Sequence, residues 1–314
     1  MDAAKALAKM DVDIVTCNTE DELIAAVKDA DILLFAGLQI TRRVLESLPK
    51  LQAIILGSVG HEQIDVDAAT DNGVIVVNNP ASQWCIEEVS NHAITLLLAC
   101  AKKLAFLNDS TKQGRWAECK RAQAPMGSIY RQTLGLVGCG GLGRMTSRKA
   151  HCFGLEVLGY DPYVNESLVY EYGITLVSLP ELLKESDFIS VHALLNEETW
   201  HLMGEKEFRQ MKPTAYFINT SRGSVVDEPA LIKALQEKWI AGAGLDVFEK
   251  EPIDSDNPLL KMDNVVVTPH SAAYSDKAFS LPAEIVAQET ARVLSGQWPK
   301  NVVNRSVKPK FNSL

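Results

Sequence analysis

A glycine-rich turn between a strand-like and a helix-like segment constrains the fold of this chain more than any other feature. Residues 133–137 (TLGLV) have the character of a buried strand, residues 138–143 follow with the spacing G-x-G-x-x-G, and residues 142–153 have a helical pattern. The first glycine allows a tight bend, the second lets a pyrophosphate approach the backbone, and the third lets helix and strand pack closely. The turn therefore predicts a dinucleotide site at Gly138, Gly140, Gly141, Leu142 and Gly143.

An acidic residue after the next predicted strand narrows the choice of dinucleotide. Residues 156–160 form that strand, and Asp161 follows directly. A carboxylate at this position can accept hydrogen bonds from the adenosine ribose and would repel a 2′-phosphate. A glycine-rich turn with an incidental aspartate is the alternative, but strand, spacing, helix and acid all agree. We therefore expect NAD, rather than NADP, as the cofactor.

The whole chain alternates strand-like and helix-like segments in two series, a pattern typical of parallel sheets. The first series has predicted strands at 13–17, 31–35, 53–56 and 74–77, with helices at 20–28, 41–48 and 66–70. The second series has predicted strands at 133–137, 156–160, 188–192, 215–219, 243–247 and 265–268. A long apolar helix at 87–103, a polar irregular stretch at 108–131 and a helix at 282–294 complete the prediction.

The length of 314 residues exceeds what one hydrophobic core usually serves, so we expect two domains. The fold class is α/β, with a doubly wound parallel sheet in each domain. The chain opens on a helix-like segment, whereas such a domain usually begins with a strand. Either the first strand is missing from the chain or the N-terminal domain is a shortened variant.

Composition argues against several classes of partner. The formal net charge is -9, and an acidic chain repels phosphate backbones, so we expect no nucleic acid partner. The six cysteines form no C-x-x-C pair, which argues against a metal site or redox dithiol. Residues 1–10 lack the apolar segment of a signal peptide, and the longest apolar run, 93–101, is too short to cross a bilayer. We expect a cytoplasmic protein with no membrane partner.

Three polar residues follow predicted strands of the second series: Arg222, Glu251 and His270. Because the carboxyl ends of parallel strands meet in one crevice, we expect these side chains to lie near the cofactor. An arginine can bind a carboxylate through two hydrogen bonds, and a histidine can give a proton to a carbonyl oxygen near neutral pH. A carboxylate on the second ring nitrogen would orient the histidine and raise its pKa.

Each of these residues also has an ordinary explanation when it is taken alone. Arg222 would be a surface charge, Glu251 a solvated loop residue, and His270 a buried, hydrogen-bonded residue. Together, beside a cofactor site, they favour the reduction of a 2-oxo acid to a 2-hydroxy acid.

Four blocks of the sequence resemble the D-isomer-specific 2-hydroxyacid dehydrogenase family. They are residues 136–144 (LVGCGGLGR), 217–228 (FINTSRGSVVDE), 242–252 (GAGLDVFEKEP) and 265–270 (VVVTPH). The resemblance extends over nearly the whole chain. It implies a Rossmann NAD-binding domain, residues 85–282, inserted into a flavodoxin-like substrate domain made of residues 1–84 and 283–314. It also implies a homodimer in which residues 103–131 form part of the contact.

The resemblance also implies roles in substrate binding and catalysis. Arg222 would bind the substrate, His270 would act as acid and base, and Glu251 would pair with His270. The backbone N–H groups of Val59 and Gly60 would hold the substrate carboxylate.

Further residues are implied to form the cofactor site. Asp161 would hold the adenosine ribose, and Asp246 would contact the nicotinamide amide. Gly141 and Leu142 would give backbone contacts to the pyrophosphate. The rest of the groove would be lined by His192, Thr220, Ser221, Arg222, His270 and Ala272.

Three departures from the family pattern bear on function. His61 and Glu62 alter the substrate loop at 57–65, residues 89–91 (VSN) replace a V-A-E triplet, and residues 271–275 (SAAYS) replace a glycine-rich run. The last two changes resemble the branch of C-terminal-binding proteins, which includes corepressors that sense NAD(H).

Two functions follow from this comparison of motifs. The first is an NAD-dependent oxidoreductase that interconverts a 2-oxo acid and the (R)-2-hydroxy acid. The alternative is an NAD(H)-sensing, corepressor-like binding protein with incidental dehydrogenase activity. The absence of a basic nuclear-targeting cluster favours the enzyme. Glyoxylate, pyruvate, hydroxypyruvate and larger 2-oxo acids all stay open as substrates, and phosphorylated ones are disfavoured because no arginine cluster lies near the substrate loop.

Overall fold

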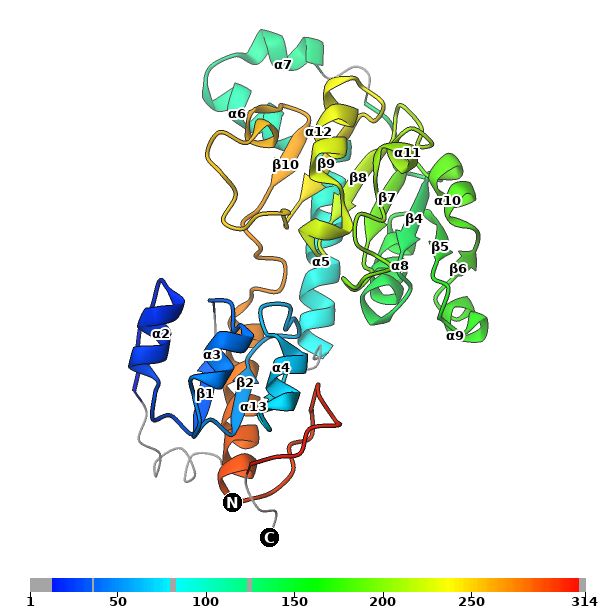
Figure 1. Ribbon diagram of the computed structural model, residues 1–314. Coiled ribbons are helices and arrows are strands. Elements are labelled where there is room, and N and C mark those ends of the chain that lie inside the picture. Colours follow the sequence, from blue (N-terminus) through cyan, green and yellow to red (C-terminus); the bar gives the residue numbers. More distant parts are fainter. Residues whose placement is uncertain (1–12, 36, 80–82, 123–125, 311–314) are drawn as a thin grey trace. The chain divides into compact units, whose positions relative to one another are not determined.

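The computed structural model describes residues 13–35, 37–79, 83–122 and 126–310, which divide into two compact units (Figure 1). The first unit comprises Met1–Trp84 and Ser275–Leu314, and the second comprises Cys85–Tyr274. The sequence predicts the second boundary between the domains at residues 282 and 283, whereas the two compact units divide between Tyr274 and Ser275. Helix α13 (Asp276–Leu294) belongs to the first unit and begins at Asp276, whereas the prediction began it at residue 282.

The first unit contains a parallel sheet of three described strands in the order β1, β2, β3. Their bounds are β1 (Ile32–Phe35), β2 (Ala53–Leu56) and β3 (Ile75–Val77). The helices that precede or connect them are α2 (Glu20–Ala26), α3 (Arg42–Glu46) and α4 (Val66–Asp71). Successive residues of β2 point to opposite faces: Ile54 and Leu56 pack with Leu45 of α3, whereas Ile55 packs with Val293 of α13. The sheet is therefore buried on both faces, as parallel sheets usually are.

Residues 13–17, predicted as the first strand, are not part of this sheet. Strand β1 pairs with β2, and residues 13–17 are irregular. The side chain of Ile14 is 95% exposed. The apolar pattern of the segment was suited to a strand, but a strand also needs a hydrogen-bonded neighbour, so this prediction is wrong.

The second unit contains a parallel sheet of seven described strands in the order β10-β9-β8-β7-β4-β5-β6. Their bounds are β4 (Thr133–Val137), β5 (Glu156–Tyr160), β6 (Ile174–Leu176), β7 (Phe188–Val191), β8 (Tyr216–Asn219), β9 (Gly242–Leu245) and β10 (Val265–Val267). Strand β6 was not predicted. The strand order reverses between β4 and β7, which is the position where doubly wound sheets bind ligands at the carboxyl ends of their strands.

Helices cover both faces of this sheet (Figure 1). One core contains side chains from α5 (Gln83–Ala101), α8 (Gly141–Cys152) and α9 (Glu166–Tyr170). The opposite core contains side chains from α10 (Leu179–Glu185), α11 (Glu205–Phe208) and α12 (Glu228–Gln236). Within β8, Phe217 points into the second core and Ile218 into the first. Two packed faces fix the register of every strand and therefore the positions at which the strands end.

The stretch 108–131, predicted as irregular, contains helical structure. Helix α6 (Leu104–Lys112) and helix α7 (Trp116–Ala122) occupy much of it. Lys103, with a φ of 49°, separates α6 from α5. The polar composition of these helices concealed them from a search for apolar periodicity, and their side chains are mostly exposed.

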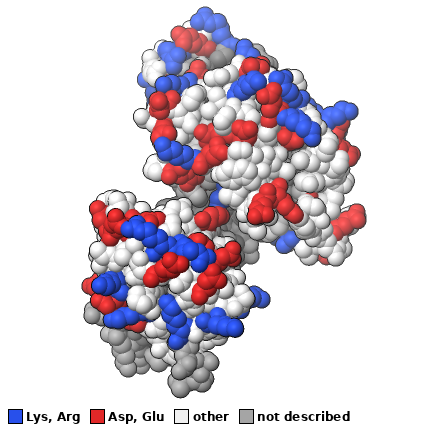
Figure 2. Space-filling model, in the orientation of Figure 1, with Lys and Arg blue, Asp and Glu red and all other residues white. Residues whose placement is uncertain are grey.

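Acidic and basic side chains are interspersed on the face of each unit shown in Figure 2. In the first unit, for example, Arg42 pairs with Asp71 at 2.9 Å and Lys50 with Asp29 at 2.6 Å. Within the described residues, no helix combines the length and apolar character needed to span a membrane.

Candidate active site

The glycine turn after β4 has the backbone geometry of a pyrophosphate site. Gly138 has a φ of 97°, and a Cβ there would lie 2.6 Å from the Ala193 nitrogen. A Cβ on Gly143 would lie 2.2 Å from the Gly138 carbonyl oxygen, so this glycine permits the close packing of α8. A Cβ on Gly140 would meet no described atom within 4 Å. The second glycine therefore faces open space, where a pyrophosphate would fit.

Helix α8 begins immediately beyond this open space. Gly140 is its N-cap and supplies no side-chain hydrogen bond, and Gly141, Leu142 and Gly143 form the first turn. The N–H groups of a first helical turn have no partner within the helix and attract anions. The first turn of α8 therefore presents backbone donors beside the open space at Gly140, and their contact with a pyrophosphate stays a prediction.

Asp161 connects the end of β5 to the glycine turn. One carboxylate oxygen accepts from the Cys139 N–H at 2.8 Å, and the other accepts from the N–H groups of Tyr163 at 2.9 Å and Val164 at 3.1 Å. The side chain is therefore held beside the turn, at the edge of the sheet where the adenosine ribose is expected. Its contact with the ribose stays a prediction.

Two buried groups at the ends of β7 and β8 have an atom with no hydrogen-bond partner among the described residues. They are Nδ1 of His192 and Oγ1 of Thr220. The Nε2 atom of His192 lies 3.0 Å from Ser190 Oγ, and burial lowers the pKa of His192 to about 4, so the ring is neutral. Because buried polar atoms are normally hydrogen-bonded, these two atoms suit a polar ligand in the groove. With the glycine turn and Asp161, they form a set that fits NAD.

Ser221 serves mainly to shape this edge. Its N–H donates to Asn219 Oδ1 at 3.0 Å, and its hydroxyl donates to the Ala193 carbonyl oxygen. These bonds join the end of β8 to the segment after β7, on either side of the predicted groove.

His270 and Glu251 form a direct pair. His270 Nδ1 lies 2.6 Å from one carboxylate oxygen of Glu251, and the other accepts from the Phe248 N–H at 3.0 Å. The hydrogen bond from Glu251 raises the pKa of His270, against the lowering effects of burial and of the Arg222 charge. Burial tends to raise the pKa of Glu251, but the hydrogen bonds from His270 and Phe248 outweigh it, so the pKa is lowered. The pair therefore favours a protonated imidazole beside an ionised carboxylate.

Arg222 follows β8, close enough for its charge to act on both members of this pair. Its Nη1 donates to the Ser221 carbonyl oxygen at 2.9 Å, and its own carbonyl accepts from Asn219 Nδ2 at 2.9 Å. The structure thus brings together the three residues that were predicted to be catalytic. Each comes from the end of a neighbouring strand, as predicted.

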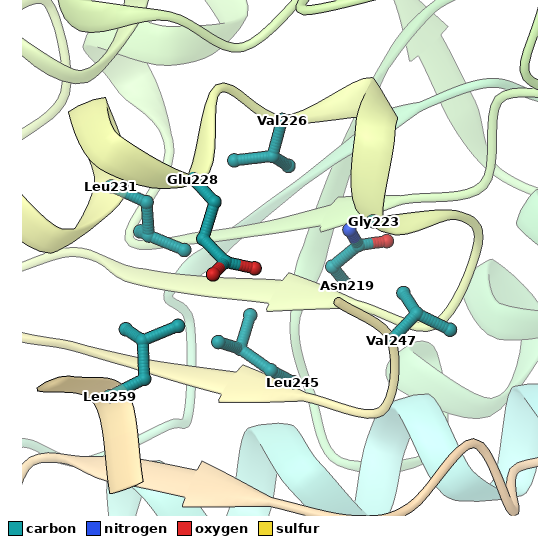
Figure 3. A pocket seen from close by; sticks show the side chains of 8 residues that line it. All are labelled: Asn219, Gly223, Val226, Glu228, Leu231, Leu245, Val247 and Leu259. Atoms are coloured by element: carbon teal, nitrogen blue, oxygen red, sulfur yellow. The ribbon is translucent and has the colours of Figure 1, made fainter. Parts of the chain in front are cut away.

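Glu228, at the start of α12, supports the turn that carries Glu251. Its carboxylate accepts from the Glu249 N–H at 3.0 Å and from Asn257 Nδ2 at 2.7 Å. Figure 3 shows this side chain among the residues that line a small pocket. The pocket is lined by Asn219, Gly223, Val226, Glu228, Leu231, Leu245, Val247 and Leu259. It is an interior packing space between α12 and the strand ends.

Asp246 is fully buried, and its carboxylate holds the segment that contains His270. One oxygen accepts from Thr268 Oγ1 at 2.5 Å and from the Ser271 N–H at 2.9 Å, and the other accepts from the Ala272 N–H at 2.9 Å. Burial tends to raise the pKa of Asp246, but hydrogen bonds from His92, Thr268 and the two N–H groups lower it. The sequence-based contact of Asp246 with the nicotinamide amide stays a prediction; in the structure the Asp246 carboxylate binds Thr268, Ser271 and Ala272.

Val59 and Gly60 lie in the first unit, on a loop after β2. The loop is held by Asn78 Nδ2, which donates to the Val59 carbonyl oxygen at 2.8 Å, and by Ser58 Oγ, which donates to the Gly60 carbonyl oxygen at 3.0 Å. The N–H groups of Val59 and Gly60 donate to no described residue. They are therefore available to a carboxylate.

Sequence reasoning missed three supporting residues, Glu228, Thr268 and His92. Thr268 immediately precedes the Pro269–His270 pair, and Glu228 ends a block that was quoted for its resemblance. His92 gave no local signal, because its contacts lie far away in the sequence. The described residues contain no group of three or more metal-ligating side chains.

A Rossmann-type sheet, a glycine turn at its switch point and an Arg, Glu and His set at the strand ends define an NAD-binding oxidoreductase. Residues 94–272 match the family model described as D-isomer specific 2-hydroxyacid dehydrogenase, NAD binding domain. The chain is 43% identical over 287 residues to a glyoxylate reductase of Korarchaeum cryptofilum, covering 91% of this chain and 86% of that one. The chain therefore belongs to the D-isomer specific 2-hydroxyacid dehydrogenase family, and its cofactor is NAD.

Two further relatives show the breadth of the similarity. A D-3-phosphoglycerate dehydrogenase of Methanocaldococcus jannaschii is 40% identical over 307 residues, which are 96% of this chain and 57% of that one. The solved apo structure of D-lactate dehydrogenase from Escherichia coli superposes with a TM-score of 0.78 at 30% identity, covering 91% of this chain and 89% of that one.

Proposed function

We propose that this protein reduces a small 2-oxo acid to the (R)-2-hydroxy acid with NADH, and catalyses the reverse reaction with NAD. The observation that carries the proposal is the 2.6 Å pair of His270 and Glu251 beside Arg222. The relatives named above are reductases or dehydrogenases of small oxo and hydroxy acids, and nothing in them supports the corepressor alternative.

Bound NADH supplies the hydride, and the chain supplies charge and a proton. Arg222 binds the substrate carboxylate through its planar guanidinium. His270 would give its Nε2 proton to the carbonyl oxygen of the substrate as that carbonyl is reduced. Glu251 stabilises the imidazolium before that transfer and holds the ring by Nδ1, which leaves Nε2 for the substrate. In the reverse direction, neutral His270 accepts the hydroxyl proton.

Within the first unit, the N–H groups of Val59 and Gly60 would be a separate set of donors suited to a carboxylate. His61 and Glu62 follow them directly, in place of residues that the family pattern usually has. We therefore assign side-chain selectivity to this loop. Glyoxylate is the first substrate to test, because the relative that is 43% identical over 287 residues is a glyoxylate reductase.

The test is NADH oxidation over a panel of glyoxylate, pyruvate, hydroxypyruvate and phosphohydroxypyruvate. We expect turnover on at least one unphosphorylated acid, and a loss of at least about 100-fold in His270→Ala, the usual size for a general acid. Chiral analysis of the product from pyruvate should give the (R) form. Turnover of no member of the panel, or near wild-type turnover by His270→Ala, would contradict the proposal.

We further propose a homodimer that uses residues 103–131. Leu104 and Trp116 in this stretch are 59% and 64% exposed, and a cavity of about 350 Å³ lies beside α6, lined in part by Phe106 of α6 and Val266 of β10. Light scattering should give a dimer for the wild type and a shift towards monomer for Trp116→Ala. Trp298→Ala, an exposed tryptophan of the first unit, is the matched control. An unchanged mass for Trp116→Ala would argue against this surface.

A further inference from the structure

Asp246 and Thr268 hold the backbone on either side of His270, and we call this arrangement the clamp. A second histidine, His92, reaches the clamp from the long helix α5. His92 Nε2 lies 2.9 Å from Thr268 Oγ1 and 3.4 Å from Asp246 Oδ1. Its side chain is 19% exposed, so this arrangement is largely shielded from water. None of the roles assigned above to substrate or cofactor binding uses His92.

The directions of the hydrogen bonds can be assigned from the donors that are present. Thr268 has one hydroxyl hydrogen, and Asp246 is an ionised acceptor, so Thr268 Oγ1 donates to the carboxylate across 2.5 Å. The lone pairs of the Thr268 oxygen then accept from His92, which must carry a hydrogen on Nε2. A chain of donors therefore runs from His92 through Thr268 to Asp246.

The end of this chain bears directly on the backbone of His270. The His270 N–H donates to the Asp246 carbonyl oxygen at 2.8 Å, and the next two N–H groups donate to the Asp246 carboxylate. His270 has a φ of 51°, a left-handed conformation that a non-glycine residue keeps only when its surroundings impose it. Asp246 imposes this left-handed conformation, because it binds the N–H of His270 and the N–H groups of the two residues that follow.

We propose that His92 is a positioning residue for the reaction: its Nε2–H fixes the Thr268 hydroxyl on Asp246, and Asp246 then holds His270 in register with Glu251. The inference rests on the proposed function in that His270 is the acid and base. Among the described residues, His92 hydrogen-bonds to neither member of the His270–Glu251 pair, and its effect reaches them through the 268–272 segment.

The variants that test this proposal distinguish the loss of the N–H donor of His92 from the loss of the volume of its ring. His92→Gln keeps an N–H donor of similar reach, whereas His92→Leu removes it. Thr95→Leu is the matched control, because Thr95 is exposed one turn further along α5 and its hydroxyl bonds, among the described residues, only to the Asn91 carbonyl oxygen of the same helix. Thermal unfolding of each variant gives a measure of folding.

We expect His92→Leu to lower kcat for 2-oxo-acid reduction by about 10- to 100-fold, the range for a small misplacement of a catalytic group. The KM for the acid should change little, because Arg222 is untouched. His92→Gln should recover most of kcat, and Thr95→Leu should match the wild type. Equal losses in His92→Leu and His92→Gln, or no loss in His92→Leu, would overturn the proposal.

Should His92→Leu fail to fold, Thr268→Val breaks the same chain at its middle. In a double-mutant cycle of His92→Gln with Thr268→Val, measured on kcat, the combined loss should be smaller than the product of the two single losses, because His92 acts largely through the Thr268 hydroxyl. Additive effects would contradict a shared chain of donors.

A measurement without turnover separates this inference from the proposed function. NMR titration of His270, which faces Glu251, Arg222 and Asp246, should give a raised pKa in the wild type and His92→Gln. In His92→Leu the pKa should fall towards its ordinary value as the pair loosens. That result in a protein without reductase activity would retain the clamp and refute the function. An active His92→Leu enzyme with an unchanged His270 pKa would instead refute the clamp and retain the proposed function.

Discussion

Glu251 holds Nδ1 of His270 at 2.6 Å and thereby raises the pKa of that imidazole. The consequence for pH dependence follows from the protonation state that each direction needs. Reduction uses the protonated ring, so its rate is high below the raised pKa and falls as pH rises through it. Oxidation uses the neutral ring and rises over the same interval. Both midpoints should lie above about 6.5, the ordinary pKa of histidine.

Replacing Glu251 by Gln should move this pH profile. The amide keeps a hydrogen-bond acceptor but no charge, so the pKa of His270 should fall and the reduction limb should shift to lower pH. Oxidation should persist to lower pH for the same reason. The measurement is kcat against pH in both directions, for wild type and Glu251→Gln. A profile that stays in place would show that a different group titrates.

Gly223→Ala should damage the site by displacing the turn that carries Glu251. A Cβ at Gly223 would lie 1.9 Å from the carbonyl carbon of Phe248, far inside van der Waals contact. We expect a loss of about 1–3 kcal/mol in the free energy of unfolding, as for other overpacked sites. The value of kcat for the folded variant should also fall, because Glu251 is displaced. Chemical denaturation and NADH oxidation give the two numbers. Full activity in Gly223→Ala would be inconsistent with this contact.

Gly140→Ala should separate cofactor binding from folding. Because a Cβ at Gly140 meets no described atom within 4 Å, the free energy of unfolding should change by no more than about 0.5 kcal/mol. The added methyl group would occupy the space expected for the pyrophosphate, so NADH titration should give a markedly weaker Kd. Gly143→Ala is the contrasting variant, since its Cβ would clash with the Gly138 carbonyl and should destabilise the fold. An unchanged Kd in Gly140→Ala would place the pyrophosphate elsewhere.

Asp161→Asn should reduce the preference for NADH over NADPH. The amide oxygen can still accept from the Cys139 N–H, at the loss of the bonds from Tyr163 and Val164, and the negative charge that repels a 2′-phosphate is gone. A shift on the order of tenfold in the ratio of kcat/KM values is expected, equivalent to about 1.4 kcal/mol. Steady-state kinetics with both cofactors measure it. If the ratio did not move, the carboxylate would have no part in choosing the cofactor.

Much of the second unit was predictable because its signals are local. Strands β4 and β5 begin and end where the sequence predicts, since apolar runs and the glycine turn mark their limits. The positions of Arg222, Glu251 and His270 at strand ends follow from the same pattern, because parallel strands present their carboxyl ends to one edge.

The errors arose where the pattern of single residues does not decide the structure. Residues 13–17 have the pattern of a strand but lack a neighbour in the sheet, and α6 and α7 are helices whose surfaces are mostly polar. The helix predicted at 282–294 begins earlier, at Asp276.

By itself, the sequence determined the class of fold, the dinucleotide turn and the residue types needed for hydride transfer to a 2-oxo acid. These are properties of short segments, in which spacing and side-chain chemistry are enough. The tertiary structure decided how Asp246, Thr268 and His92 hold His270, and how Glu228 supports the turn of Glu251. His92 and Thr268 stand 176 positions apart in the chain, and only the packing of α5 against the sheet brings their atoms within hydrogen-bonding distance.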